Sequence, residues 1–153
     1  MDSRLRPSGH QGALVTTYES FVRYQREEAQ TWEHLALARA RTVAGDAAGG
    51  QAALAEVRRA IAGRRRAPWA EVADMRRKVE EQRADELSGG IAFKTGAGGL
   101  MDVDFLAAGA ALERGGRMAT PEFPGNAALL RAAAPGPRTE ELLSAYTFLR
   151  QVE

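Results

Sequence analysis

Two aspartates separated by one residue, Asp102 and Asp104, stand in the stretch GGLMDVDF. On a β-strand, residues i and i+2 point to the same side, so such a pair can hold two metal ions for transfer of a nucleotidyl group. On an α-helix the same side chains diverge by about 200° and cannot share a metal. The residues that follow are rich in Ala and Leu, which favours a helix. We therefore expect Asp102 to be a helix-start acid and Asp104 to be packed or hydrogen-bonded, with a self-contained metal-dependent nucleotidyltransferase as the alternative.

The glycine-rich stretch KTGAGG precedes these aspartates, directly after the short extended piece IAF. It lacks the Gly-Lys-Ser/Thr ending that places a lysine and a metal-binding hydroxyl in a phosphate loop. A connector that leads into a helix N-terminus is the simpler interpretation. An anion at that helix start, with Lys94 nearby, remains chemically reasonable.

The first nine residues, MDSRLRPSG, have the period of a β-strand. Asp2, Arg4 and Arg6 alternate with other residues and would share one face of it. Pro7 cannot continue a ladder, and a lone strand of this length is unstable in water. The chain offers no convincing partner strand, so we expect its sheet to lie outside this chain.

Composition excludes several classes of function. The chain has 153 residues, with 21 basic and 20 acidic side chains, a net charge of +1 and no cysteine. Nothing in this balance indicates a nucleic-acid-binding or membrane-binding surface, and there is no thiolate metal site or Cys nucleophile. No apolar run is long enough to span a membrane, and the N-terminus lacks an apolar signal core. A cytoplasmic protein is the default expectation.

Hydrophobic periodicity predicts an all-α bundle of about six helices. The first runs from Tyr18 to about Val43, continuous or broken near Thr31, with Thr16 or Thr17 as its cap. Glycines at 45 and 49–50 form the link to the next helix. Further helices are expected at 51–63, 68–88, 99–116, within 126–138 and at 138–153, the last capped by Thr139.

The stretch TWEHLALARAR, residues 31–41, carries the most distinctive side chains of the first helix. Trp32 is interpreted as a core residue rather than a ligand platform. His34 is expected at the surface or between helices. By default, Glu33, Arg39 and Arg41 are solvated surface charges.

Taken together, RLRPSG, TWEHLALARAR and GAGGLMDVDF, in this order and spacing, resemble the glutamine synthetase adenylyltransferase family over nearly the whole chain. Members of that family carry two similar halves, each a nucleotidyltransferase head followed by a helical bundle. One half transfers AMP from ATP to a tyrosine of glutamine synthetase, and the other removes it by phosphorolysis. TWEHLALARAR looks more like the adenylylating, C-terminal half.

The resemblance implies a division of the chain into residues 1–15, a remnant of the catalytic head, and residues 16–153, the helical bundle. Asp2 matches the third catalytic carboxylate of the head, which completes a Mg²⁺ site beside an upstream Asp-x-Asp. Arg4 and Arg6, together with Lys94, are candidates for binding ATP phosphates. The sequence departs from the family pattern at Ser3, where an apolar residue is usual, and at Asp104, where relatives commonly have Glu.

The resemblance also implies partners and a limit on activity. Glutamine synthetase and a PII-type signal protein are the expected partners. Four bundle residues, besides Lys94, are candidates to face the nucleotide cleft: Glu33, Arg39, Arg41 and Asp102. Without the Gly-Ser and Asp-x-Asp strands of a head, the 153 residues should be inactive alone. A non-catalytic helical interaction module is the competing hypothesis.

Overall fold

The computed structural model describes residues 15–62, 69–83, 92–114 and 125–152, and these form seven α-helices. The helices are α1 (Tyr18–Glu27), α2 (Thr31–Ala38), α3 (Ala47–Ala62), α4 (Trp69–Arg83), α5 (Leu100–Glu113), α6 (Asn126–Ala133) and α7 (Pro137–Gln151). Within these ranges there is no strand, so the all-α prediction is confirmed there. The predicted strand at Asp2–Arg6 lies outside the described residues.

The helix count is seven rather than six because the first predicted helix is broken just before Thr31, one of the two expected alternatives, and forms two helices. Thr17 caps α1 as expected, its side chain accepting from the Ser20 N–H at 3.1 Å. At the other end the Glu28 and Ala29 amides both donate to the Tyr24 carbonyl, which closes α1. Glu33 then accepts from the Gln30 N–H at 2.9 Å and starts α2. A carboxylate three residues into a helix satisfies an otherwise orphaned amide, and this favours the break.

Helix α3 begins earlier than periodicity predicts, so Gly49 and Gly50 lie in its first turn and not in a link. Asp46 accepts from the Gly49 N–H at 2.9 Å through its side chain, as an N-terminal cap does. A Cβ at Gly49 would lie 2.7 Å from the Tyr18 ring, and one at Gly50 would lie 2.5 Å from the Thr42 hydroxyl. Glycine is therefore needed here for close packing.

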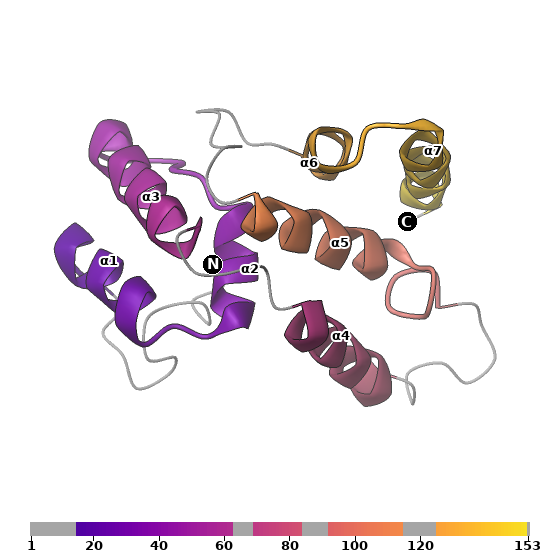
Figure 1. The fold of residues 1–153 in the computed structure, drawn as a ribbon, viewed down its shortest axis with the longest axis horizontal. Coiled ribbons are helices and arrows are strands. Elements are labelled where there is room, and N and C mark those ends of the chain that lie inside the picture. Colours follow the sequence, from indigo (N-terminus) through magenta and orange to yellow (C-terminus); the bar gives the residue numbers. More distant parts are fainter. Residues whose placement is uncertain (1–14, 63–68, 84–91, 115–124, 153) are drawn as a thin grey trace.

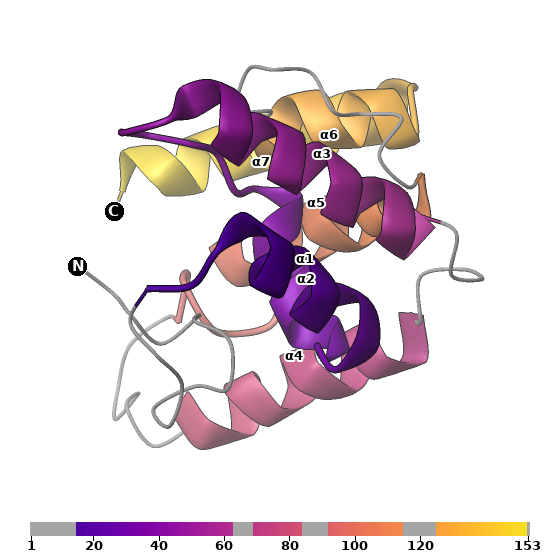
Figure 2. The same cartoon turned by 90° about the vertical axis from the view of Figure 1, so that its left-hand side faces the viewer.

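Helix α5 lies at the centre of the bundle, with α1 and α3 to one side of it, α6 and α7 to the other, and α4 across a third face (Figures 1 and 2). Its apolar residues face several neighbours at once, as its nearly uniform hydrophobicity predicts. Val103 and Ala107 pack with Leu129, Leu130 and Leu143 of α6 and α7. Ala108, on another face of α5, packs with residues of α2 and α4.

The corner between α6 and α7 differs in detail from the prediction. Helix α7 begins at Pro137, a residue suited to the first helical position. Thr139, expected as its cap, instead donates its hydroxyl to the Ala134 carbonyl at the end of α6. Arg131 and Glu140 join the two helices through two hydrogen bonds of 2.7 and 2.8 Å. Thr139 therefore closes the preceding helix rather than opening its own.

None of the helices in the described parts of the chain is both long and apolar enough to cross a bilayer.

Candidate functional site

Asp102 lies in the first turn of α5 and is held by a buried arginine of α4. The Arg76 side chain is 10% exposed, and its Nε donates to the Asp102 carboxylate. Its Nη2 donates to the carbonyls of Thr95 and Gly96, each at 2.9 Å. The other oxygen of Asp102 accepts from the Gly98 N–H at 2.6 Å. One guanidinium and one carboxylate thus fasten the glycine loop to α4 and α5.

The glycine loop is a series of turns from 92 to 99, not an extended piece followed by a free connector. The Leu100 and Met101 amides donate to the carbonyls of Phe93 and Lys94 at 2.9 and 3.0 Å. Gly98 has φ +75°, and a Cβ at Gly99 would lie 2.7 Å from the Phe93 oxygen. The glycines permit the chain to fold back on itself.

The first turn of α5 consequently offers little to an anion. The amides of Gly98, Leu100, Met101 and Asp102 already donate to protein oxygens. A phosphate at a helix start relies on such amides being free. Lys94 is exposed beside this turn, so its role in phosphate binding stays a prediction that rests on its own charge.

Asp104, two residues further along α5, faces another set of helices. Its Oδ1 accepts from Arg39 Nη1 at 2.9 Å and from Asn126 Nδ2 at 2.5 Å. The Asn126 Nδ2 also lies 3.0 Å from the Tyr146 hydroxyl, which extends the network to α7. Asp102 and Asp104 diverge as expected of a helix. Among the described residues no group of three or more His, Cys, Asp or Glu side chains could hold a metal.

The helical interpretation of the two aspartates is therefore confirmed, and a self-contained two-metal centre built on them is wrong. Each carboxylate is neutralised by an arginine from a different helix. The described residues do not fit a Mg²⁺ centre of their own.

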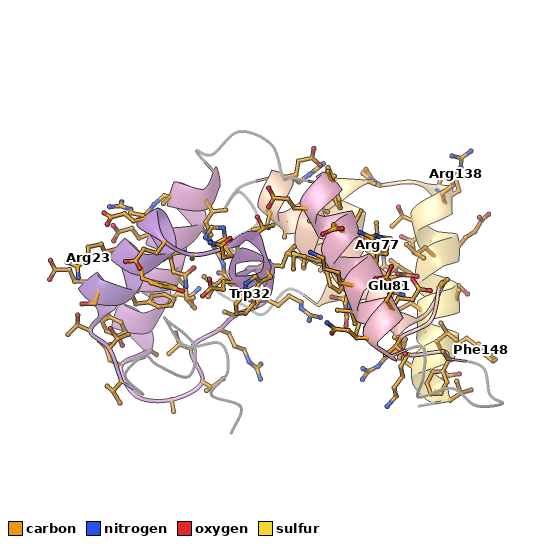
Figure 3. The ribbon with its side chains drawn as sticks, turned by 90° about the horizontal axis from the view of Figure 1, so that it is seen from below. Arg23, Trp32, Arg77, Glu81, Arg138 and Phe148 are labelled. Carbon is orange, nitrogen blue, oxygen red and sulfur yellow. The ribbon has the colours of Figure 1, made fainter. Side chains whose placement is uncertain are left out.

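Three expectations for TWEHLALARAR need correction. Arg39 is not a solvated surface charge, because it is half-buried and ion-paired with Asp104 at 2.9 Å. Glu33 is not a solvated surface charge: it is buried and accepts from the Tyr24 hydroxyl at 3.0 Å as well as from the Gln30 amide. Trp32 is not a core residue, because its side chain is 42% exposed beside α4 (Figure 3). His34 lies between helices as expected, buried with its Nε2 3.1 Å from the Gln25 carbonyl oxygen. The break after α1 changes the direction in which the first residues of α2 point, and this explains the positions of Trp32, Glu33 and His34.

The cleft-facing candidates fall at separate places. Glu33 lies in the α1–α2 corner, Arg39 at the end of α2, and Asp102 with Lys94 at the start of α5. Arg41 is exposed just beyond α2. Asp2, Arg4 and Arg6 lie outside the described residues, so their catalytic and phosphate-binding roles stay predictions.

Two residues of the polar network, Arg76 and Asn126, are not among the site residues predicted from the sequence. Each had a signal in its spacing. Arg76 stands four residues after Val72 on the apolar stripe of α4, and Asn126 stands three and four residues before Leu129 and Leu130. A polar side chain on an apolar stripe is buried with its helix face and therefore needs a partner.

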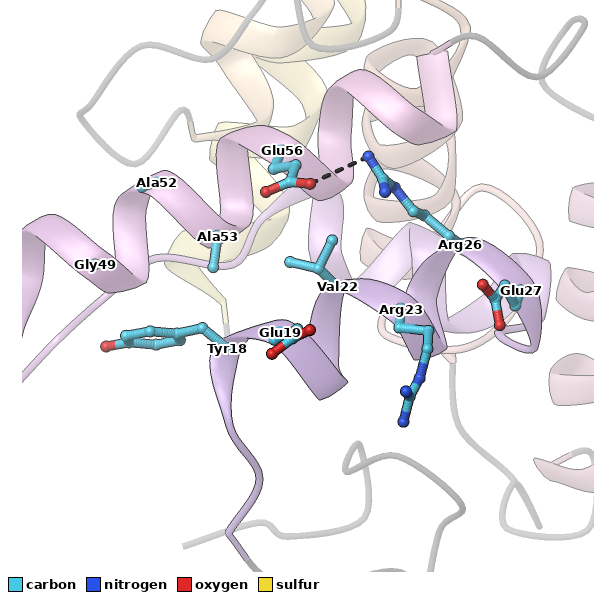
Figure 4. Close-up of a pocket in the computed structure, with 10 residues that line it drawn as sticks. All are labelled: Tyr18, Glu19, Val22, Arg23, Arg26, Glu27, Gly49, Ala52, Ala53 and Glu56. Atoms are coloured by element: carbon cyan, nitrogen blue, oxygen red, sulfur yellow. Dashed lines mark ion pairs between the residues drawn. The ribbon is translucent and has the colours of Figure 1, made fainter.

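A groove of about 610 Å³ lies between α1 and α3 on the outer surface (Figure 4). Val22 and Ala53 form its buried floor, and Tyr18 lies beside Gly49 at one end. Arg26 and Glu56 form an ion pair of 3.1 Å across it. The groove takes no part in the two arginine–aspartate contacts.

Fold and site together define an all-α bundle whose central helix is fixed by two arginine–aspartate contacts. Comparison with known sequences adds the family. The family described as glutamate-ammonia ligase adenylyltransferase matches residues 1–56.

Proteins named bifunctional glutamine synthetase adenylyltransferase/adenylyl-removing enzyme are similar over most of the chain. That of Aromatoleum aromaticum is 46% identical over 142 residues, which is 86% of this chain and 14% of that protein. That of Mesorhizobium japonicum is 40% identical over 139 residues, 89% of this chain and 14% of that protein. That of Xanthomonas campestris is 46% identical over 109 residues, 69% of this chain and 12% of that protein. The chain belongs to the glutamine synthetase adenylyltransferase family, and it spans about one eighth of the length of these relatives.

Proposed function

We propose that the chain is the helical bundle that follows a nucleotidyltransferase head, in an enzyme that transfers AMP from ATP to a tyrosine of glutamine synthetase and removes it by phosphorolysis. The single observation that carries this proposal is the identity of 40–46% with enzymes of that name over 69–89% of the chain. The all-α fold agrees with a bundle rather than a catalytic head.

Residues 1–15 belong to the head in this proposal, and residues 16–153 to the bundle. Asp2 supplies one carboxylate to a Mg²⁺ site whose other ligands come from the head, and Arg4 and Arg6 neutralise phosphate charge. The diverging aspartates of α5 support this view, because neither is available as a metal ligand beside the other. A metal held by Asp2 alone would bind weakly, so the 153 residues by themselves are inactive.

The bundle closes the nucleotide cleft and carries contacts to glutamine synthetase and a PII-type protein. The rigid loop at 92–99 is the part best suited to the cleft, because its backbone is fixed and Lys94 is exposed on it. A pre-organised cation near phosphate contributes without a further ordering cost. Asp102 would then position the loop that carries Lys94.

A chimera tests the proposal directly. The corresponding stretch of the Aromatoleum aromaticum enzyme is replaced by this chain, and AMP transfer from labelled ATP to glutamine synthetase is measured. We expect the chimera to be active, and Asp2→Asn to lower the rate by about 10²-fold or more. Glu141→Gln, on the exposed face of α7, is the matched control and should leave the rate unchanged.

Three results would count against the proposal. A folded but inactive chimera contradicts the assignment to the bundle. Full activity of Asp2→Asn removes Asp2 from the catalytic residues. Magnesium-dependent ATP turnover by the 153 residues alone contradicts the dependence on a head.

A further inference from the structure

Arg76 is a buried charge whose place on α4 is not explained by stability alone. Its side chain is 10% exposed, and it follows Val72 on the apolar stripe that packs against α2 and α5. Burying a guanidinium has a large desolvation cost, and replacing both partners of a buried ion pair by apolar residues is often neutral or stabilising. The advantage of arginine at this position lies in the geometry that its fork of donors imposes on its partners.

The guanidinium of Arg76 holds two consecutive peptide groups of the glycine loop. Its Nη2 donates to the carbonyls of Thr95 and Gly96, each at 2.9 Å, while its Nε donates to Asp102. The Asp102 carboxylate also accepts from the Gly98 N–H at 2.6 Å. A planar group with donors on all three nitrogens fixes the directions of its hydrogen bonds as well as their lengths. Arg76 therefore determines how the peptide planes of this loop are turned.

Lys94 directly precedes these two peptide groups, and its own backbone is held as well. The Lys94 carbonyl accepts from the Met101 amide at 3.0 Å, and the Phe93 carbonyl accepts from the Leu100 amide at 2.9 Å. The Lys94 side chain is exposed, with its Nζ 6.0 Å from the centre of the Phe93 ring. The start of α5 thus fixes the backbone before this lysine, and Arg76 fixes the backbone after it.

We propose that Arg76 is a positioning residue for AMP transfer. Its guanidinium sets the conformation of the peptide groups at Thr95 and Gly96, and this conformation places the Lys94 ammonium at the phosphates of bound ATP. A cation whose backbone is ordered in advance loses less conformational entropy when phosphate binds. This role of Arg76 rests on the proposed function, because it acts on ATP through Lys94 and not by direct contact.

Arg77, the next residue along α4, provides a matched comparison. It is 60% exposed, and its ion pairs with Asp74 and Glu81 stay within the same helix. Removing either arginine takes one positive charge from neighbouring positions of α4, so the change in long-range electrostatics is similar. A difference between the two variants in the use of ATP therefore reports on the loop and not on the charge.

Steady-state kinetics of AMP transfer by the chimera with the Aromatoleum aromaticum enzyme test this role. We expect Arg76→Met to raise KM for ATP on the order of tenfold, and Arg77→Met to leave it unchanged. Lys94→Ala should raise KM for ATP at least as much. The double variant Arg76→Met, Lys94→Ala should be no worse than Lys94→Ala alone, because both changes remove the same interaction with ATP. Arg76→Lys should restore KM only in part, since an ammonium lacks the planar fork.

A core variant separates loss of positioning from loss of folded protein. Leu129→Ala, at a position of α6 that is 1% exposed, should destabilise the chain by an amount comparable to Arg76→Met. A smaller folded fraction lowers the apparent kcat but not KM, so Leu129→Ala should leave KM for ATP unchanged. Circular dichroism of the 153-residue chain carrying each substitution verifies that it is folded.

Several results would overturn this role: an unchanged KM for ATP in Arg76→Met or in Lys94→Ala, additive effects of these two changes, or full rescue by Arg76→Lys. A wild-type chimera without activity contradicts the proposed function instead, and the loop is then tested on the 153-residue chain. There the Gly96 amide should exchange with solvent faster in Arg76→Met than in Leu129→Ala. Equal exchange in the two variants overturns the positioning role without reference to AMP transfer.

Discussion

Two arginine–aspartate contacts fix the central helix, and they differ in burial. Arg76 is 10% exposed and Asp102 30%, whereas Arg39 and Asp104 are 38% and 35% exposed. Arg76 also donates to two backbone carbonyls of the glycine loop, while the contacts of Arg39 within the described parts of the chain are with the side chains of Asp104 and Asn126. The same pair of residue types therefore holds a loop shape on one face of α5 and links helices on another.

Of the two arginines, Arg76 should cause the larger loss of stability when it is removed. Arg76→Met removes one donor each from Asp102 and from the carbonyls of Thr95 and Gly96, so we expect the free energy of unfolding to fall by about 3 kcal/mol. Urea denaturation measures it. Arg77→Met, on the exposed face next to it, should change stability by less than about 0.5 kcal/mol.

The loop gives a second measurement for the same variant. Hydrogen exchange of the Leu100 and Met101 amides should accelerate in Arg76→Met more than that of the α3 amides. Equal stability of Arg76→Met and Arg77→Met, with an unchanged exchange pattern, would contradict the assigned difference between the buried and the exposed arginine.

The more exposed contact should cost less to break. For Arg39→Met we expect a loss of about 1 kcal/mol, because water can reach the Asp104 carboxylate that is left behind. A double-mutant cycle with Asp104→Asn isolates the pairwise free energy. The matching cycle of Arg76 with Asp102→Asn should give the larger coupling. The reverse order would mean that burial does not set the difference between the two contacts.

The sequence predicted the fold more fully than the site, and α5 shows why. Its Ala- and Leu-rich composition was enough to predict a helix and thereby to exclude a metal pair at Asp102 and Asp104. The identity of their partners was not predictable, because Arg76 and Asn126 are distant in sequence and meet the aspartates only after the helices pack. Spacing indicates that a polar residue is buried, but it does not indicate which helix that residue will contact.

The break between α1 and α2 shows a second limit. It depends on one carboxylate, Glu33, returning to the Gln30 amide, and periodicity carries no trace of that contact. The exposure of Trp32 and the burial of Glu33 both follow from the turn, so a single local hydrogen bond changed the interpretation of neighbouring residues. The three cleft candidates in 31–41 all lie after this break, and they are separated because α2 ends at Ala38, before Arg39 and Arg41.

A smaller effect is expected from the packing between α4 and α5. It tests whether Arg76 is the sole contact that holds these two helices together. A Cβ at Gly109 would lie 2.5 Å from the Trp69 ring. Gly109→Ala should therefore destabilise the chain by about 1 kcal/mol, although alanine is the better helix former by about the same amount. In a Trp69→Leu background the sign should reverse. A stabilising Gly109→Ala in the wild-type background would show that the ring moves aside freely.

The smallest expected effect concerns two exposed ion pairs, Asp74–Lys78 on α4 and Arg131–Glu140 between α6 and α7. A hydrogen bond from Lys78, then one from Arg77, lowers the pKa of Asp74, and a hydrogen bond from Arg131 lowers the pKa of Glu140. A carboxyl whose pKa is lowered on folding stabilises the fold above its ordinary value of about 4, and this stabilisation is lost as the pH falls through the lower, folded value. Glu140→Gln and Asp74→Asn should each make stability decline less steeply as the pH falls through that acidic range. A salt concentration of 1 M should reduce the effect, because both pairs are exposed.

Urea denaturation at pH 6 and pH 3 measures the change in stability, with Glu141→Gln as the control outside these two pairs. The Asp74–Lys78 pair lies within one helix, whereas the Arg131–Glu140 pair joins two helices. A larger effect of Asp74→Asn would therefore mean that pairing within a helix matters more to stability than the link between helices.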